Sequence, residues 1–92
     1  MENVRNQIVL VDTANVLLSP AHYRNEIVIT NTSSGAQVIT ISFGDIAIAG
    51  EGVVLQPNSV YFGSNTAGFN VFQGDIFIIG NGSGGQVSIF ER

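Results

Sequence analysis

Short apolar runs alternate with short polar stretches along the whole chain. The clearest case lies in residues 24–62, where the runs Glu26–Thr30 and Gln37–Phe43 flank the polar stretch Asn31–Gly35. Two β-prone runs joined by a short polar stretch that contains glycine are typical of a β-hairpin. The second run alternates isoleucine or phenylalanine with threonine or serine, which indicates a strand with one buried face.

Similar runs occur on both sides of this segment, and none of them shows the helical period of 3.6 residues. We therefore expect about eight or nine strands. Besides the two runs above, the candidate runs are Ile8–Val11, Val16–Leu18, Ile46–Ala49, Val53–Gln56, Val60–Phe62, Phe69–Gln73, Ile76–Ile79 and Val87–Phe90. Met1–Gln7 is expected to be a flexible lead-in. Regularly spaced short strands predict one all-β domain over residues 1–92, a small antiparallel β-sandwich, with a jelly roll as the favoured version.

The composition indicates that this sandwich does not stand alone. The chain has 92 residues and no cysteine, and a domain of this size buries only about 60–65% of its unfolded surface. Charged residues make up 11% of the chain, against roughly 25% in typical soluble domains. One explanation is that neighbouring subunits cover much of the surface, since interface cores are poor in charge. The other is a β-protein whose exposed strands carry threonine, serine and asparagine.

Charge and hydropathy exclude two classes of partner. The net charge is −4, whereas binding to nucleic acid needs a basic surface. No apolar run approaches the roughly 18 residues of a membrane-spanning helix, so we expect no membrane insertion. The first residues lack the basic and apolar regions of a secretory signal, which indicates synthesis in a cytoplasm.

Two glycine-containing motifs have structural interpretations. The pattern G-D-I-x-I-x-G occurs at Gly44–Gly50 and again at Gly74–Gly80. We interpret it as one type of turn used twice, with a strand after each, although two aspartate turns at one end of the molecule could also bind a cation. Gly80–Gly85 matches the nucleotide-binding pattern G-x-G-x-x-G, but a strand rather than a helix follows it, so we expect a glycine-rich hairpin loop.

No catalytic, metal-binding or cofactor-binding residues are predicted. His22 is the one histidine, and Ser19 precedes a proline without the pattern of a nucleophile elbow. A zinc site would need more histidine or cysteine than the chain contains. Aromatic residues on alternating strands are usually buried, and Phe72 is the one expected to be the most exposed.

The order of these segments resembles a known type of protein. The resemblance rests on Arg24–Asn31, Val38–Phe43, Gly52–Asn58, Val60–Phe62, Asp75–Ile79 and Gln86–Glu91. The chain is similar in pattern to the small β-sandwich structural proteins of bacteriophages and other viruses, which decorate capsids, occupy vertices or form spikes and fibres. The resemblance implies a non-enzymatic protein that is made in a host cytoplasm and resides in the virion.

We therefore expect a homo-oligomer, a trimer or a pentamer, that docks on a major capsid protein or another virion protein. The candidate interface residues are Ile8, Leu10, Val16, Leu18, Val87 and Ile89. Deleting Met1–Val11 should then weaken assembly more than folding. The alternative is a glycan-binding module that presents the loops Asn31–Gly35, Gly63–Gly68 and Gly80–Gly85 to a host glycan.

Overall fold

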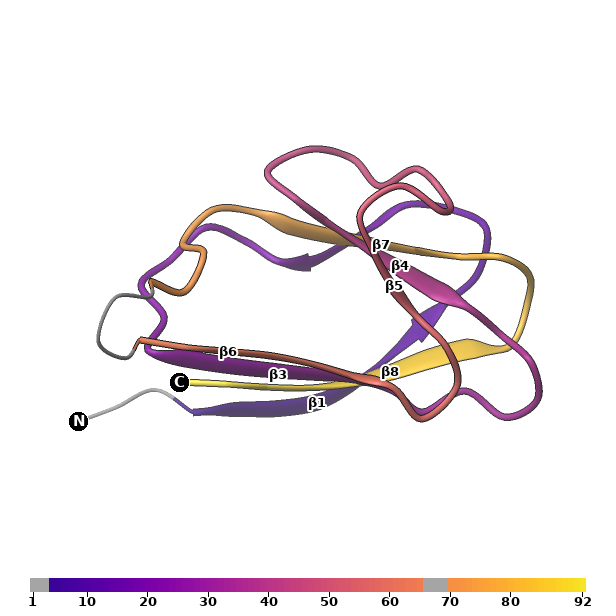
Figure 1. Cartoon of the computed structure of the whole chain (residues 1–92), viewed down its shortest axis with the longest axis horizontal. Coiled ribbons are helices and arrows are strands. Elements are labelled where there is room, and N and C mark those ends of the chain that lie inside the picture. The colour runs from indigo at the N-terminus through magenta and orange to yellow at the C-terminus, as the bar shows by residue number, and fades with distance from the viewer. Residues whose placement is uncertain (1–3, 66–69) are drawn as a thin grey trace.

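The computed structural model describes residues 4–65 and 70–92, which form eight antiparallel strands and no helix. The strands are β1 (Arg5–Val11), β2 (Val16–Ser19), β3 (Glu26–Asn31), β4 (Ile39–Phe43), β5 (Val53–Leu55), β6 (Val60–Ser64), β7 (Ile76–Gly80) and β8 (Gly85–Glu91). A first sheet has the order β1-β8-β3-β6 and a second sheet the order β2-β7-β4-β5. The two sheets pack face to face as in a sandwich (Figure 1), which confirms the all-β prediction. Residues 4–65 and 70–92 contain no helix that is long and apolar enough to cross a membrane.

The pairing follows one rule. The first strand pairs with the eighth, the second with the seventh, the third with the sixth and the fourth with the fifth. Two further pairings, β3 with β8 and β4 with β7, complete the sheets. Among the described strands, only β4 and β5 are both consecutive and paired. The predicted hairpin from Glu26 to Phe43 is therefore wrong, because β3 and β4 belong to different sheets.

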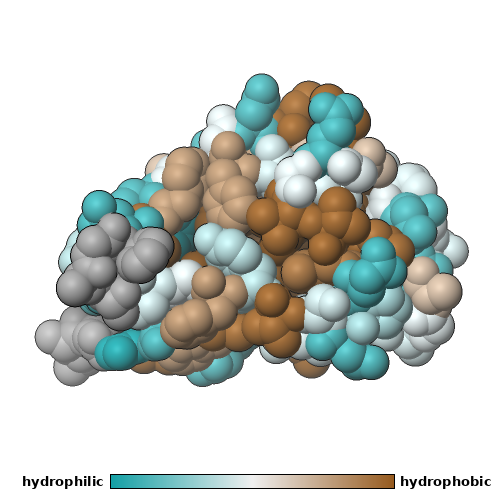
Figure 2. Space-filling view, viewed as in Figure 1, coloured by the Kyte–Doolittle hydropathy of each residue, from teal (hydrophilic) through white to brown (hydrophobic). Residues whose placement is uncertain are grey.

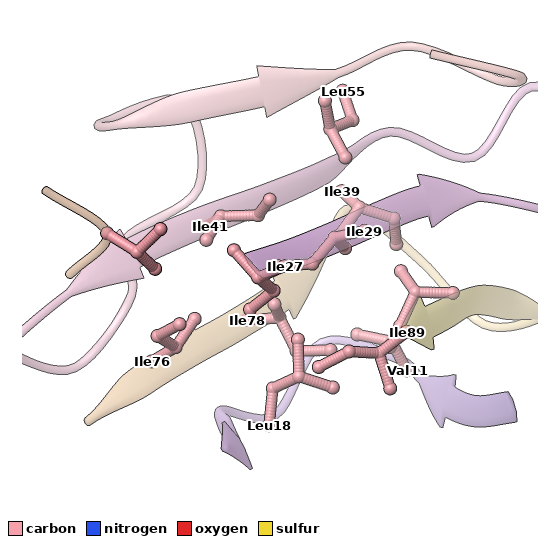
Figure 3. Packing of buried hydrophobic residues seen from close by; sticks show 12 residues of the cluster. Val11, Leu18, Ile27, Ile29, Ile39, Ile41, Leu55, Ile76, Ile78 and Ile89 are labelled. Carbon is pink, nitrogen blue, oxygen red and sulfur yellow. The ribbon is translucent and has the colours of Figure 1, made fainter. Parts of the chain in front are cut away.

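The core lies between the sheets and is built mainly of isoleucine. Alternate residues of each strand point inward, as the period of a strand requires. Figure 3 shows these side chains meeting between the two layers. The cluster is Val11, Leu18, Ile27, Ile29, Ile39, Ile41, Leu55, Val71, Ile76, Ile78, Val87 and Ile89. Each such side chain contributes about 1.5–3 kcal/mol by its burial, so this cluster holds the sheets together.

Residues 46–49 were expected to form a strand, and this prediction is wrong. The side chains do alternate, with Ala47 buried between exposed Ile46 and Ile48. However, the side chain of Asn15 takes both backbone groups of Ala47: its amide donates to the carbonyl oxygen at 2.7 Å, and its oxygen accepts from the N–H at 2.6 Å. The Asn15 side chain therefore makes the backbone hydrogen bonds that a neighbouring strand would otherwise make.

The strand predicted over Phe69–Gln73 fails for the same reason. Phe69 lies outside the described residues, and residues 70–73 are not in a strand. The backbone N–H of Val71 donates to the side chain of Asn65 at 2.7 Å, and the Gln73 amide donates to the Val71 carbonyl at 2.9 Å. Side-chain amides again replace a partner strand.

Two further predictions, one about a strand boundary and one about a hairpin, differ from the structure. Arg5–Gln7, assigned to a flexible lead-in, belong to β1 and pair with β8. The stretch Gly80–Gly85 connects two sheets and is not a hairpin. Its glycines allow close backbone contact: the Gly80 N–H donates to the Asp12 carbonyl at 2.7 Å, and a Cβ on Gly85 would lie 2.5 Å from the Val11 carbonyl oxygen.

Asn31 organises the end of the sandwich where β3 finishes. It is fully buried, and its amide donates to the carbonyls of Gln37 and Leu55, each at 2.9 Å. Its side-chain oxygen accepts from the Ser33 N–H at 3.0 Å. One polar side chain thus fixes the connections into β4 and out of β5, and satisfies buried carbonyls that would otherwise be costly.

Deleting residues 1–11 should abolish folding, contrary to the expectation from sequence. The deletion removes β1, the core residue Val11 and the seven register pairs that cover one side of β8. We expect weak far-ultraviolet circular dichroism and no cooperative melting transition. A truncated chain that melts cooperatively near the wild-type temperature, and has lost only its ability to assemble, would contradict this.

Candidate functional site

The six residues predicted for an interface divide into two groups. Leu18, Val87 and Ile89 are 2%, 0% and 1% exposed, and Val16 is partly buried against the same core. The interface assignment is wrong for the three buried residues, because this chain's own core takes up their side chains. Both edges of β8 are also paired, to β1 and to β3.

Ile8 and Leu10 remain surface candidates, with exposed fractions of 62% and 74%. They point to the outer face of β1, whereas Val9 and Val11 point to the core. A run that is apolar on both faces could not reveal from sequence which face is the inner one. The pattern was compatible with a strand between two layers and with a strand covered by a partner.

The strand register extends this surface across the first sheet. Val28 of β3 lies between Phe90 of β8 and Phe62 of β6, and all three share a face. Phe62 is 57% exposed and Val60, on the same face, is 54% exposed. We call this surface the outer apolar face; it consists of Ile8, Leu10, Val28, Val60, Phe62 and Phe90. Polar residues lie between them on the same face: Glu26 and Thr30 on β3, and Gln86 and Ser88 on β8.

The second sheet is partly covered by its own chain. The connection between β4 and β5, residues 44–52, lies above that sheet in Figure 1. The Asn15 side chain holds it at Ala47, and the Gly50 N–H donates to the Thr40 hydroxyl at 3.0 Å. Thr40 is only 2% exposed as a result. Figure 2 shows that hydrophobic residues also form a band across the middle of the visible side, with hydrophilic residues towards both ends.

A buried ion pair closes the end of the sandwich where β1 begins and β8 ends (Figure 1). Arg24 is fully buried just before β3. Its guanidinium donates to Glu91 Oε2 (3.0 Å), to the Ser19 hydroxyl (2.8 Å) and to the carbonyls of Phe72 (2.8 Å), Gly74 (3.0 Å) and Pro20 (2.9 Å). These partners belong to both sheets, so one side chain links the layers. Nothing in the sequence pattern indicated that Arg24 is buried.

Glu91 carries the opposing charge and is 3% exposed. It accepts hydrogen bonds from Ser19, Arg24 and Arg5 at 2.9, 3.0 and 3.2 Å, and His22 Nε2 lies 3.6 Å away. Burial by itself raises the pKa of Glu91. The hydrogen bonds from Ser19, Arg24 and Arg5 and the charge of His22 outweigh burial and hold the pKa below its ordinary value of 4.5.

Ser19, His22 and Glu91 therefore lie close together, as the members of a catalytic triad would. Their bonding is different. The Ser19 hydroxyl is fully buried and donates to Glu91 instead of to the histidine. His22 Nδ1 donates to the Pro20 carbonyl at 2.8 Å. The base bonded to the serine is Glu91, whose carboxylate is held by Arg24 and Arg5, and His22 does not contact the hydroxyl, so the bonding is that of a structural link.

The repeated G-D-I-x-I-x-G turns do lie together, since the Gly44 N–H donates to the Asp75 carbonyl at 2.8 Å. Each aspartate carboxylate accepts from a backbone N–H: Asp45 from Ile46 at 2.8 Å and Asp75 from Ala21 at 2.7 Å. Within residues 4–65 and 70–92, no three acidic, histidine or cysteine side chains gather as a metal site would require. Only the second turn leads into a strand, β7.

The aromatic residues are arranged differently from the expectation. Phe72 is 36% exposed, but its ring makes an edge contact with Phe43 at 5.4 Å between centroids. Tyr23 and Phe62, at 69% and 57%, are more exposed than Phe72. The prediction that Phe72 is the most exposed aromatic residue is wrong.

Comparison of the chain with protein-family models, curated proteins and solved structures finds no significant match. The arguments about function below therefore rest on the residues and their geometry.

Replacing Glu91 by glutamine should destabilise the fold at neutral pH by about 3–5 kcal/mol, because Arg24 would keep a buried charge without its partner. The folded-state pKa of Glu91 is depressed, so its stabilising effect is present above its ordinary pKa and is lost as the pH falls through the folded value. The stability difference between wild type and Glu91→Gln should shrink between pH 7 and pH 3.

Urea unfolding at both pH values measures this difference. Glu26→Gln is the matched control, because Glu26 forms a partly exposed pair with Arg92 at 2.7 Å and its loss should cost only about 0–1 kcal/mol. An equal difference between wild type and Glu91→Gln at pH 7 and pH 3 would contradict the buried ion pair.

Proposed function

We propose that this protein is a non-enzymatic structural subunit of a virion, which acts by assembling with copies of itself and docking on a capsid. The observation that carries the proposal is the outer apolar face. Four of its side chains, Ile8, Leu10, Val60 and Phe62, are more than half exposed. On the second sheet, residues 44–52 cover Thr40 while Leu17 and Val54 remain 49% and 39% exposed, so the strand side chains of the first sheet are the more exposed ones.

The size of the molecule is compatible with a protein interface on the first sheet. The described chain measures 36 × 22 × 20 Å, so one broad face offers about 800 Å2 before curvature, close to what each partner contributes to a standard protein interface. Burial of apolar surface stabilises by roughly 25 cal/mol per Å2, before the cost of association is subtracted. A face of this size and character is sufficient for a specific contact.

We infer further that the fold is a jelly roll. The support is the order in which strands pair, the first with the last and so on inward to β4 and β5, with every other connection passing between the sheets. Jelly rolls of eight strands build viral capsid domains and lectin domains. This favours the virion assignment over other structural roles. If it is right, the gene should lie beside capsid or tail genes; a neighbourhood of metabolic genes would contradict it.

A glycan-binding module is the second candidate, because lectins share this architecture and the structure contains an open groove. The groove has a volume of about 330 Å3 and lies where the β1–β2 turn meets the connection from β7 to β8. It is lined by Leu10, Val11, Asp12, Val16, Ser83, Gly84 and Gly85. Asp12 and Ser83 could bind sugar hydroxyls. Specific binding on a glycan array by protein that does not self-associate would favour this candidate over the first.

The proposed function predicts an oligomer at micromolar concentration. Size-exclusion chromatography with light scattering should give a mass that is a whole multiple of 9.7 kDa, with a trimer or pentamer expected. Phe62→Asp should shift the mass towards the monomer, because it places a charge on the outer apolar face. Ile48→Asp is the matched control on the covering loop of the second sheet. A stable wild-type monomer would refute the proposal.

A further inference from the structure

The four sheet edges differ in how they are protected. In the second sheet, β2 has an irregular register between Leu17 and Ser19 and is followed at once by Pro20. The opposite edge, β5, has only three residues. Bulges, prolines and short edge strands are the features by which proteins prevent edge-to-edge pairing. The second sheet is therefore closed to further strands.

The first sheet lacks these features at both edges. β1 has seven residues and β6 has five, each pairs with its neighbour in unbroken register, and neither contains proline. The one charged residue in either strand is Arg5, whose guanidinium donates inward to the Leu18 carbonyl at 2.8 Å and to Glu91 at 3.2 Å. Each strand therefore presents one uncharged edge that is open to another β-strand.

Both open edges also carry exposed apolar side chains on the same face of the sheet. Ile8 and Leu10 stand on β1, and Val60 and Phe62 stand on β6. A twofold contact of β1 with β1 would bring together Ile8 and Leu10 of the two copies. It would leave Val60 and Phe62 exposed to water. A contact of β6 with β1 of the next copy brings all four into lateral cross-strand contact, and the two edges together contain no pair of like charges.

We propose that copies of this chain join edge to edge through the first sheet, with β6 of one copy pairing with β1 of the next. The inference rests on the proposed function, since it specifies how the subunits of that oligomer meet. The partner is a second copy because its opposite edge supplies an uncharged strand with matching apolar residues. Head-to-tail contacts of this kind close into rings when the rotation between copies allows, which suits a trimer or pentamer.

The direction and register of the contact follow from the sheet. Three successive antiparallel pairings separate β1 from β6, so β1 of a neighbour placed beside β6 is antiparallel to it. Pairing Phe62 with Ile8 of the next copy also pairs Val60 with Leu10 and Tyr61 with Val9. The first two pairs lie on the outer face. Tyr61 and Val9 are both partly buried side chains that pack against the core from the inner face, so this register preserves the inward and outward sides of both strands.

Engineered disulfides test this register, because the wild-type chain has no cysteine. In the double variant Ile8→Cys/Phe62→Cys, the two cysteines of neighbouring copies should fall within the roughly 4.4–6.8 Å between Cα atoms that a disulfide needs. Within one chain they are three strand spacings apart, about 14 Å, and cannot react. After mild oxidation, a non-reducing gel should show a ladder that ends at the size of the ring.

The single variants are the controls, and all variants should first show the wild-type circular dichroism and light-scattering mass. Ile8→Cys and Phe62→Cys alone should stay uncross-linked. Should the first double variant fold poorly, Leu10→Cys/Val60→Cys tests the same register. Cross-linked dimers from Ile8→Cys or Val9→Cys alone would show a twofold β1–β1 contact and overturn the inference. An oligomer in which neither double variant forms a ladder would overturn it while leaving the proposed function intact, whereas a monomeric wild type would refute both.

Discussion

The contact between Arg24 and Glu91 is the constraint on which the rest of the sandwich depends. Arg24 precedes β3 and Glu91 ends β8, and the same guanidinium reaches Ser19 at the end of β2 and Gly74 ahead of β7. Two sheets held only by apolar side chains can slide over one another, whereas this fork of hydrogen bonds has one geometry. The pair is buried, so removing either partner leaves a charge without solvent and is strongly destabilising.

β3 is fixed in this way at both of its ends. Arg24 anchors the end where β8 finishes, and Asn31 anchors the opposite end through the carbonyls of Gln37 and Leu55. Between them, Ile27 and Ile29 face the core. Apolar burial supplies the stability of the layers, and the two buried polar residues determine how the strands connect. All three arginines form ion pairs within the chain: Arg5 and Arg24 with Glu91, and Arg92 with Glu26 on the face that carries Val28.

The sequence predicted the strands better than their partners. Apolar alternation located all eight strands within a few residues, because the period of two reflects which side chains are buried. It also suggested strands at residues 46–49 and 69–73, since it cannot show whether a neighbouring strand or the side chain of Asn15, Asn65 or Gln73 satisfies the backbone. The supposed hairpin between β3 and β4 failed because local sequence does not encode which sheet a strand joins. Of the predicted interface residues, Ile8 and Leu10 are exposed, whereas Leu18, Val87 and Ile89 lie in the core, because core and interface residues look alike in sequence.

The central claim is that the edges of the first sheet are completed by neighbouring copies. Hydrogen–deuterium exchange of the assembled protein tests it directly, because an edge strand leaves every second N–H unpaired unless another strand covers it. The account predicts slow exchange at successive amides along β1 and β6, comparable to the interior strands β3 and β8, and fast exchange at alternate amides of β2 and β5. Fast exchange at alternate amides of β1 and β6, as at the edges of the second sheet, would contradict it.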